Sequence, residues 1–128
     1  MKTFREKVAV ITGAGSGIGR YLAILLAKDG ADICVCDINE EGLNETVTML
    51  RNYNVSVSSH LLDVSDKESL EALPQKVIDQ HGKVDLVFNN AGVTTGAHFK
   101  DMDEDNWDWV MGINFDGVVN STRVFIPY

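Results

Sequence analysis

Basic residues and long apolar runs are both scarce in this sequence, and each shortage excludes a class of partner. Its 11 Lys and Arg residues are outnumbered by 19 Asp and Glu residues, which gives a formal net charge of −8. Binding to a nucleic-acid backbone needs clustered basic side chains, so we expect no nucleic-acid partner. No stretch approaches the roughly 18 apolar residues of a membrane helix, and the run Val8–Ile11 is too short for a secretory signal. We therefore expect a cytoplasmic protein with no membrane partner.

Cysteine is also scarce, since Cys34 and Cys36 are the two that the sequence contains. On a strand they would share a face, but their Cα atoms would be near the upper limit for a disulfide and badly oriented for one. The three histidines show no metal-ligand spacing to these cysteines, so we expect no metal site. The pair is typical of buried free thiols in a reducing compartment.

Short apolar, β-branched runs alternate along the chain with segments of helical periodicity. The runs are continuously apolar, which indicates strands buried on both faces of a parallel sheet. With a helix between successive strands, the pattern predicts an α/β fold, a doubly wound parallel sheet of Rossmann type. Right-handed crossovers give the strand order 3-2-1-4. The predicted strands are Val8–Thr12, Ile33–Asp37, Val55–Leu62 and Val84–Asn89.

The helices between these strands are predicted from apolar spacing and from capping residues. Ser65 and Glu68 have the spacing of a capping box, and Pro74 predicts a kink or a break in the helix that they open. The acidic run near Asp103 is typical of a helix N-terminus. We expect one of Trp107 and Trp109 to pack and the other to lie at the surface. The predicted helices are Ser16–Asp29 (apolar face Ile18, Leu22, Leu25 and Leu26), Asn39 or Glu40 to about Asn52, Ser65 to Gly82, and about Asp103 onward with an interruption near Gly112.

The segment TGAGSGIG, Thr12 to Gly19, follows the first predicted strand and carries most of the functional signal. Its glycines at Gly13, Gly17 and Gly19 have the spacing G-x-x-x-G-x-G, one residue longer than the usual dinucleotide fingerprint. Such a loop permits a tight turn, a close backbone approach to a phosphate, and a helix N-terminus directed at the anion. A glycine-rich turn without a ligand is the alternative. The spacing resembles the cofactor loop of the short-chain dehydrogenase/reductase family, so we assign cofactor binding to Thr12, Gly13, Ser16, Gly17, Ile18 and Gly19.

Further positions strengthen the resemblance to that family. Asp37 ends the second strand, where a carboxylate can accept bonds from both ribose hydroxyls, although it could also cap the next helix. The resemblance implies that Asp63 and Val64 contact the adenine. The segment Asn89-Asn90-Ala91-Gly92 matches the family's NNAG, which implies that Asn90, Ala91 and Gly92 brace the sheet and line the cofactor ribose.

Catalytic residues are incompletely represented. Asn114 matches the family's asparagine that belongs to a catalytic tetrad, distorts its helix and helps to hold a proton-relay water. The family's serine and its Tyr-x-x-x-Lys motif are not supplied, because no tyrosine here has a lysine four residues later. Residues 1–128 would therefore be a cofactor-binding Rossmann-type domain that covers the N-terminal half of the family pattern. We expect the chain alone to bind NAD weakly or not at all and to turn nothing over.

The resemblance implies an NAD(P)-dependent oxidoreductase that transfers hydride between an alcohol or carbonyl substrate and nicotinamide. We expect NAD rather than NADP, because Asp37 would repel a 2′-phosphate and no basic residue stands just after it or at Ser16. We also expect a homo-oligomer formed through the C-terminal helix. A non-catalytic nucleotide-binding fragment is one alternative. An S-adenosylmethionine-dependent methyltransferase is another, since Gly13, Gly15, Gly17 and Asp37 fit its pattern as well.

Overall fold

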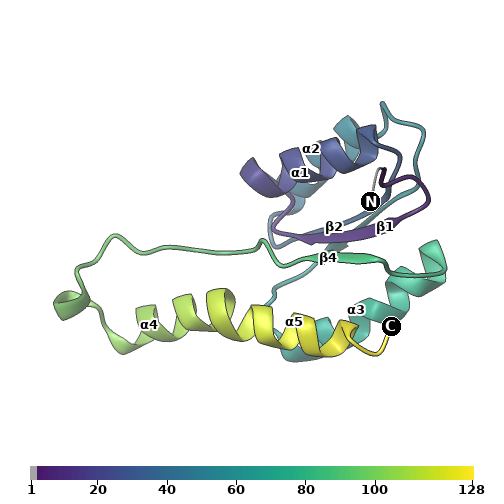
Figure 1. The fold of residues 1–128 in the computed structure, drawn as a ribbon. Coiled ribbons are helices and arrows are strands. Elements are labelled where there is room, and N and C mark those ends of the chain that lie inside the picture. The colour runs from purple at the N-terminus through teal and green to yellow at the C-terminus, as the bar shows by residue number, and fades with distance from the viewer. Residues whose placement is uncertain (1–2) are drawn as a thin grey trace.

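The computed structural model describes residues 3–128 and has one four-stranded parallel sheet between two layers of helices (Figure 1). The strand order is β3-β2-β1-β4, as the sequence predicts. Helices α1 and α2 cover one face of the sheet, and α3 and α5 cover the other (Figure 1). The strands are β1 (Val8–Thr12), β2 (Asp32–Asp37), β3 (Val57–Leu61) and β4 (Leu86–Phe88); the α-helices are α1 (Gly17–Lys28), α2 (Glu40–Leu50), α3 (Lys67–His81), α4 (Glu104–Met111) and α5 (Gly117–Phe125).

The alternation of side chains along β1 and β2 produces two separate hydrophobic cores. All five residues of β1 are buried, and its parallel register pairs Val10 with Cys34 and Ile11 with Val35. Ile11 and Val35 belong to the core under α1 and α2, whereas Val10 and Cys34 belong to the core over α3 and α5. The continuous apolar runs of these strands therefore serve both faces of the sheet.

The predicted apolar face of α1 is confirmed for two of its four residues, since Leu26 is buried and Leu22 packs against the core. It is wrong for Ile18 and Leu25, which are 80% and 63% exposed; the buried positions are Gly19, Ala23, Leu26 and Ala27. Three of these four residues are small, which lets the helix approach the sheet and the glycine loop closely. Close approach, rather than side-chain size, decides which face of this helix is buried.

The capping box predicted for α3 is wrong, and of the kink or break predicted at Pro74 the break is wrong. The helix begins after Asp66 rather than Ser65, and the Ser65 hydroxyl donates to Asp63 Oδ1 at 2.6 Å, so no capping box forms. The helix runs unbroken through Pro74, which is buried. As predicted, it ends at Gly82, which has a φ of 80° and adopts the left-handed conformation that favours glycine.

The region from β4 onward is less enclosed than predicted. β4 spans three residues rather than six, and all three are only half-buried. A 3-10 turn at Phe99–Asp101 precedes α4, whose N-cap Asp103 accepts a bond from Asn106 N–H. Helices α4 and α5 are joined by a π-helical turn, Gly112–Asp116, at the predicted interruption. Trp107 and Trp109 are 46% and 48% exposed, so neither is buried, although Trp107 packs edge-to-face against Phe99 with ring centroids 6.1 Å apart. Within residues 3–128 no helix has the length and apolar character needed to cross a membrane.

Candidate cofactor site

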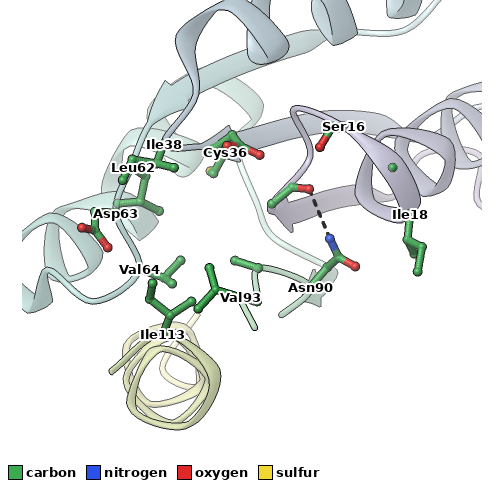
Figure 2. A pocket seen from close by; sticks show the side chains of 15 residues that line it. Ser16, Ile18, Cys36, Ile38, Leu62, Asp63, Val64, Asn90, Val93 and Ile113 are labelled. Carbon is green, nitrogen blue, oxygen red and sulfur yellow. Dashed lines mark hydrogen bonds between the residues drawn. The ribbon is translucent and has the colours of Figure 1, made fainter. Parts of the chain in front are cut away.

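A cavity of about 390 Å³ opens at the carboxyl ends of the strands, between the loop after β1 and the segment after β4 (Figure 2). This is the position where the switch in strand order leaves a crevice for a ligand. Thr12 and Gly19 stand directly behind its wall, and Asn114 neighbours the lining residue Ile113. The predicted site residues that line the cavity are Gly13, Ser16, Gly17, Ile18, Asp37, Asp63, Val64, Asn90, Ala91 and Gly92.

The loop after β1 can exist only with glycine at its contact points. Gly13 has a φ of 67°, and a Cβ there would lie 2.8 Å from Ala91 Cα. A Cβ on Gly19 would overlap the Gly13 carbonyl oxygen and lie 2.6 Å from Asn90 Nδ2. Ser16, the N-cap of α1, makes no side-chain hydrogen bond to the first turn of the helix. Ser16 therefore leaves the first N–H groups of α1 uncapped, and because Gly17 and Ile18 line the cavity these groups are candidates to bind an anion there.

Asp37 brings a carboxylate to the cavity wall, directly beside the glycine loop. Its Oδ2 accepts a bond from Gly15 N–H at 2.8 Å, and its Oδ1 accepts one from Asn39 N–H at 2.9 Å. Each carboxylate oxygen has further lone pairs, so both can still accept bonds from a ligand's hydroxyls. Asn39, not Asp37, is the N-cap of α2, where its side chain accepts a bond from Gly42 N–H. The helix cap and the predicted ribose contact are therefore separate residues.

Asn90 and Thr12 tie β4 to β1 behind the cavity. The Asn90 amide donates to the carbonyl oxygens of Thr12 and Gly13, each at 3.2 Å (Figure 2). The buried Thr12 hydroxyl oxygen accepts bonds from Asn90 N–H and Ala91 N–H, each at 3.1 Å. These bonds join the two strands beyond the end of their ladder and hold both walls at a fixed separation.

The third side of the cavity is mainly apolar. Leu62, Val64 and Ile113 project into it, and Ile38 stands at its rim (Figure 2). The Oδ1 atom of Asp63 accepts a hydrogen bond from the backbone N–H of Ser65 at 2.9 Å. Apolar walls with a single polar edge suit a flat heteroaromatic ring.

Asn114 lies in the π-helical turn, and both ends of its side-chain amide form a hydrogen bond with the backbone of Val93. Its Oδ1 accepts a bond from Val93 N–H at 2.8 Å, and its Nδ2 donates to the Val93 carbonyl at 2.7 Å. The side chain thus fastens the turn to the segment that lines the cavity. The predicted role in holding a relay water stays a prediction.

Arg20 and Thr46 contact the same loop and were not predicted. Arg20 Nη2 donates to the Gly15 carbonyl at 2.5 Å, and Thr46 Oγ1 donates to the Ala14 carbonyl at 2.8 Å. Thr46 falls on the apolar face of α2 between Leu43 and Leu50, and a polar residue at a core position is the signal that could have identified it.

The cysteines are buried as predicted, and Cys36 lines the cavity. Donation from the Cys36 thiol to Cys34 lowers the pKa of Cys34, whereas the same bond and burial raise the pKa of Cys36. Among the residues that the structure describes, no group of three His, Cys, Asp or Glu side chains is placed to hold a metal ion.

Comparison with known proteins agrees with this architecture. The chain is 37% identical over 122 residues to the 3-oxoacyl-[acyl-carrier-protein] reductase of Thermotoga maritima, covering 95% of this chain and 50% of that protein. A short chain dehydrogenase/reductase from Burkholderia phymatum in complex with NAD superposes with a TM-score of 0.94 at 42% identity, covering 99% of this chain and 45% of that one. Carveol dehydrogenase from Mycobacterium avium in complex with NAD superposes with a TM-score of 0.90 at 31% identity, covering 96% of this chain and 49% of that one. The chain therefore spans about half the length of these relatives.

A family model, described as short chain dehydrogenase, matches residues 7–128 and so includes every predicted site residue. Together with the parallel sheet and the glycine loop, this match shows that the chain belongs to the short-chain dehydrogenase family.

Proposed function

We propose that the cavity binds NAD and that the protein is an NAD-dependent oxidoreductase acting on an alcohol or carbonyl substrate. The observation that carries this proposal is that the start of α1 and the Asp37 carboxylate line the same cavity, with Asp37 bonded to Gly15 N–H in the loop between them. Backbone N–H donors at a helix start suit a pyrophosphate, and a carboxylate beside them suits ribose hydroxyls. Two similar structures were determined with NAD bound, which supports the same assignment here.

We propose NAD rather than NADP because, within residues 3–128, acidic side chains follow Asp37 and the nearby Arg20 is already paired. A 2′-phosphate would meet the Asp37 carboxylate and then Glu40 and Glu41 in the first turn of α2. The guanidinium of Arg20 is paired with Glu45 at 2.9 Å and bound to two backbone carbonyls. Repulsion between like charges would therefore favour the cofactor without the extra phosphate.

The residues of this chain would hold the cofactor, while the proton-transfer residues of the family pattern are not among them. When bound, NAD supplies the hydride acceptor. Gly17, Ile18 and Gly19 would bind its phosphates, Asp37 its ribose, and the apolar wall near Val64 its adenine. Asn90, Ala91 and Gly92 would shape the other ribose site, and Asn114 would position this segment through Val93.

We further propose a cytoplasmic homo-oligomer. Two buried free thiols support a reducing compartment. Phe115 and Trp109 are 58% and 48% exposed along α4 and the turn after it, which supports an intersubunit surface there.

Titration of the labelled chain with NAD, NADP and S-adenosylmethionine, followed by ¹H–¹⁵N NMR, tests the cofactor assignment and tolerates weak binding. We expect NAD to shift the amides of Gly17–Gly19 and Asp37, with weaker effects from NADP and none from S-adenosylmethionine. Asp37→Asn should narrow the difference between NAD and NADP, and Asp108→Asn, on the exposed side of α4, should not. Shifts confined to another surface, or caused by S-adenosylmethionine alone, would overturn the proposal. The chain alone should form no NADH from alcohols.

A further inference from the structure

Three consecutive carbonyl groups of the glycine loop are each held by a side chain from a different element. The Gly13 carbonyl accepts from Asn90 Nδ2, the Ala14 carbonyl from Thr46 Oγ1, and the Gly15 carbonyl from Arg20 Nη2. These side chains follow β4, lie on α2 and lie on α1, respectively. Every carbonyl oxygen from Gly13 to Gly15 is thereby engaged by the protein itself.

The orientation of these carbonyls matters because a peptide group presents either its C=O or its N–H to one side. A carbonyl oxygen turned toward a pyrophosphate would repel it, whereas an N–H group would bind it. Glycine-rich backbone has little steric resistance to such a rotation. Side chains that anchor the carbonyls would therefore keep the loop in the conformation that binds an anion.

Arg20 is built into this arrangement rather than exposed to solvent. Its side chain is 18% exposed, and Nη2 contacts the carbonyls of Gly15 and Gly42 and the Glu45 carboxylate at 2.5, 3.1 and 2.9 Å. Its Nε donates to Thr46 Oγ1 at 2.9 Å. One guanidinium thus connects the loop to three positions on α2.

Thr46 completes the connection from α2. It is fully buried, and its hydroxyl donates to the Ala14 carbonyl while accepting from Arg20. One turn earlier, a Cβ on Gly42 would lie 2.6 Å from the Gly15 carbonyl oxygen, so α2 touches the loop without an intervening side chain. Helix α2 therefore supports the loop directly, although it lines none of the cavity.

We infer that Arg20 and Thr46 are positioning residues for the phosphate-binding loop, acting by holding the Ala14 and Gly15 carbonyls away from the ligand. This inference rests on the proposed binding of a dinucleotide. It assigns part of the affinity for the pyrophosphate to α2, which does not touch the ligand.

The test compares ADP, which carries the pyrophosphate, with adenosine, which does not. Thr46→Val removes the hydroxyl at nearly constant volume, and Thr48→Val, on the exposed face of the same helix, is the matched control. Arg20→Met removes the guanidinium, and Arg20→Lys restores the charge without its fork of donors. Dissociation constants are measured by NMR titration of the chain with ADP, NADH and adenosine.

We expect Thr46→Val and Arg20→Met each to weaken the binding of ADP and NADH about tenfold, because each removes one hydrogen bond to a loop carbonyl, while the affinity for adenosine changes less than about twofold. The affinity of Arg20→Lys for ADP and NADH should lie between the affinities of Arg20→Met and of the unmodified chain. Thr48→Val should bind both ligands as the unmodified chain does. Equal weakening of ADP and adenosine would show a general structural role and overturn the inference, as would unchanged ADP binding. If Thr46→Val does not fold, the two Arg20 variants decide the matter by the same criterion. Because the cavity holds the proposed phosphate and ribose contacts, weak but measurable binding by the unmodified chain is now the expected outcome, and failure to bind both NADH and ADP would overturn the proposed function as well.

Discussion

β1 and β4 are neighbours in the sheet, yet their surroundings differ. β1 is fully buried and pairs with β2 over five residues, whereas β4 is half-buried and pairs with β1 over three. The loop that follows β1 is held by Asp37, Arg20 and Thr46, and the segment that follows β4 is held by Thr12 and Asn114. The cavity wall after β1, proposed to bind phosphate and adenosine, therefore continues from a buried strand. The wall after β4, near Gly92, continues from a half-buried strand and is held by a few polar bonds.

The largest expected effect is that of filling the close contact behind the β1 loop. Gly19→Ala places a methyl group on the Gly13 carbonyl oxygen, which is backbone and cannot move aside without displacing the loop. We expect a loss of at least about 3 kcal/mol in the free energy of unfolding, measured by urea denaturation. Gly96→Ala, where a Cβ meets open space, is the control and should change little. Equal stability of the two variants would mean that the loop is not packed as described.

The second effect tests the bonds that join the two walls. Thr12→Val keeps the shape of a buried strand residue but removes the acceptor of Ala91 N–H, and it leaves Asn90 N–H with only its bond to the Phe88 carbonyl at 3.0 Å. We expect a cost of about 2 kcal/mol in unfolding free energy. Thr94→Val, at an exposed position after β4, should cost nothing measurable. Hydrogen exchange should also accelerate at Asn90 and Ala91 more than within β2; uniform acceleration would contradict the separation of the walls.

The third effect concerns the opposite end of β4. Burial raises the pKa of Asp85, but the bond from Val8 N–H at 2.8 Å and the Lys83 ammonium at 3.0 Å outweigh it and hold the pKa below its usual value. The carboxylate therefore stabilises the fold at neutral pH, and this contribution is lost as pH falls below about 3.8 and through the folded-state pKa.

Asp85→Asn should accordingly reduce the unfolding free energy by about 1 kcal/mol at pH 7, with the difference shrinking in acid. Asp79→Asn, whose carboxylate is exposed on α3, serves as the control. Thermal unfolding between neutral pH and pH 3 measures both variants. A difference that stays constant across that range would exclude the carboxylate as the tie between β4 and β1.

The same comparison explains what the sequence could predict. β1, β2 and the order of the sheet follow from continuous apolar runs and the handedness of crossovers, which are local or general properties. The glycine spacing and NNAG were sufficient to place both walls of the cavity. The predicted strand Val84–Asn89 was too long because apolar Val84 drew the start back past Asp85; Asp85 and Asn89, which are polar, lie outside β4.

Tertiary contacts account for the remaining misses. The face of α1 was misjudged because a close approach to Gly13 selects Gly19 and Ala23 over larger side chains. The supporting role of Arg20 depends on the placement of α2 beside the loop, and no spacing within the sequence encodes that placement. Serine is a residue type that often caps helices, but the Ser65 hydroxyl donates its hydrogen bond to Asp63 instead.

The smallest expected effect separates the β4 wall from the helix behind it. Asn114 is exposed, so water can replace the two bonds that it makes to Val93, and Asn114→Ala should cost less than about 1 kcal/mol in unfolding free energy. Its local effect should be larger, because Val93 N–H loses its acceptor and the turn Gly112–Asp116 loses its tie to the cavity wall. Hydrogen exchange at Val93 should therefore accelerate, while exchange at Gly15 and in β1 stays unchanged.

The variant Asn114→Asp sharpens the test. It keeps an acceptor for Val93 N–H but faces the Val93 carbonyl with a charge, so it should accelerate exchange at Val93 more than alanine does. Asn44→Ala, exposed on α2, should leave both walls unaffected. Acceleration at Gly15 in either Asn114 variant would show that the two walls respond as one unit, contrary to the difference in burial between β1 and β4.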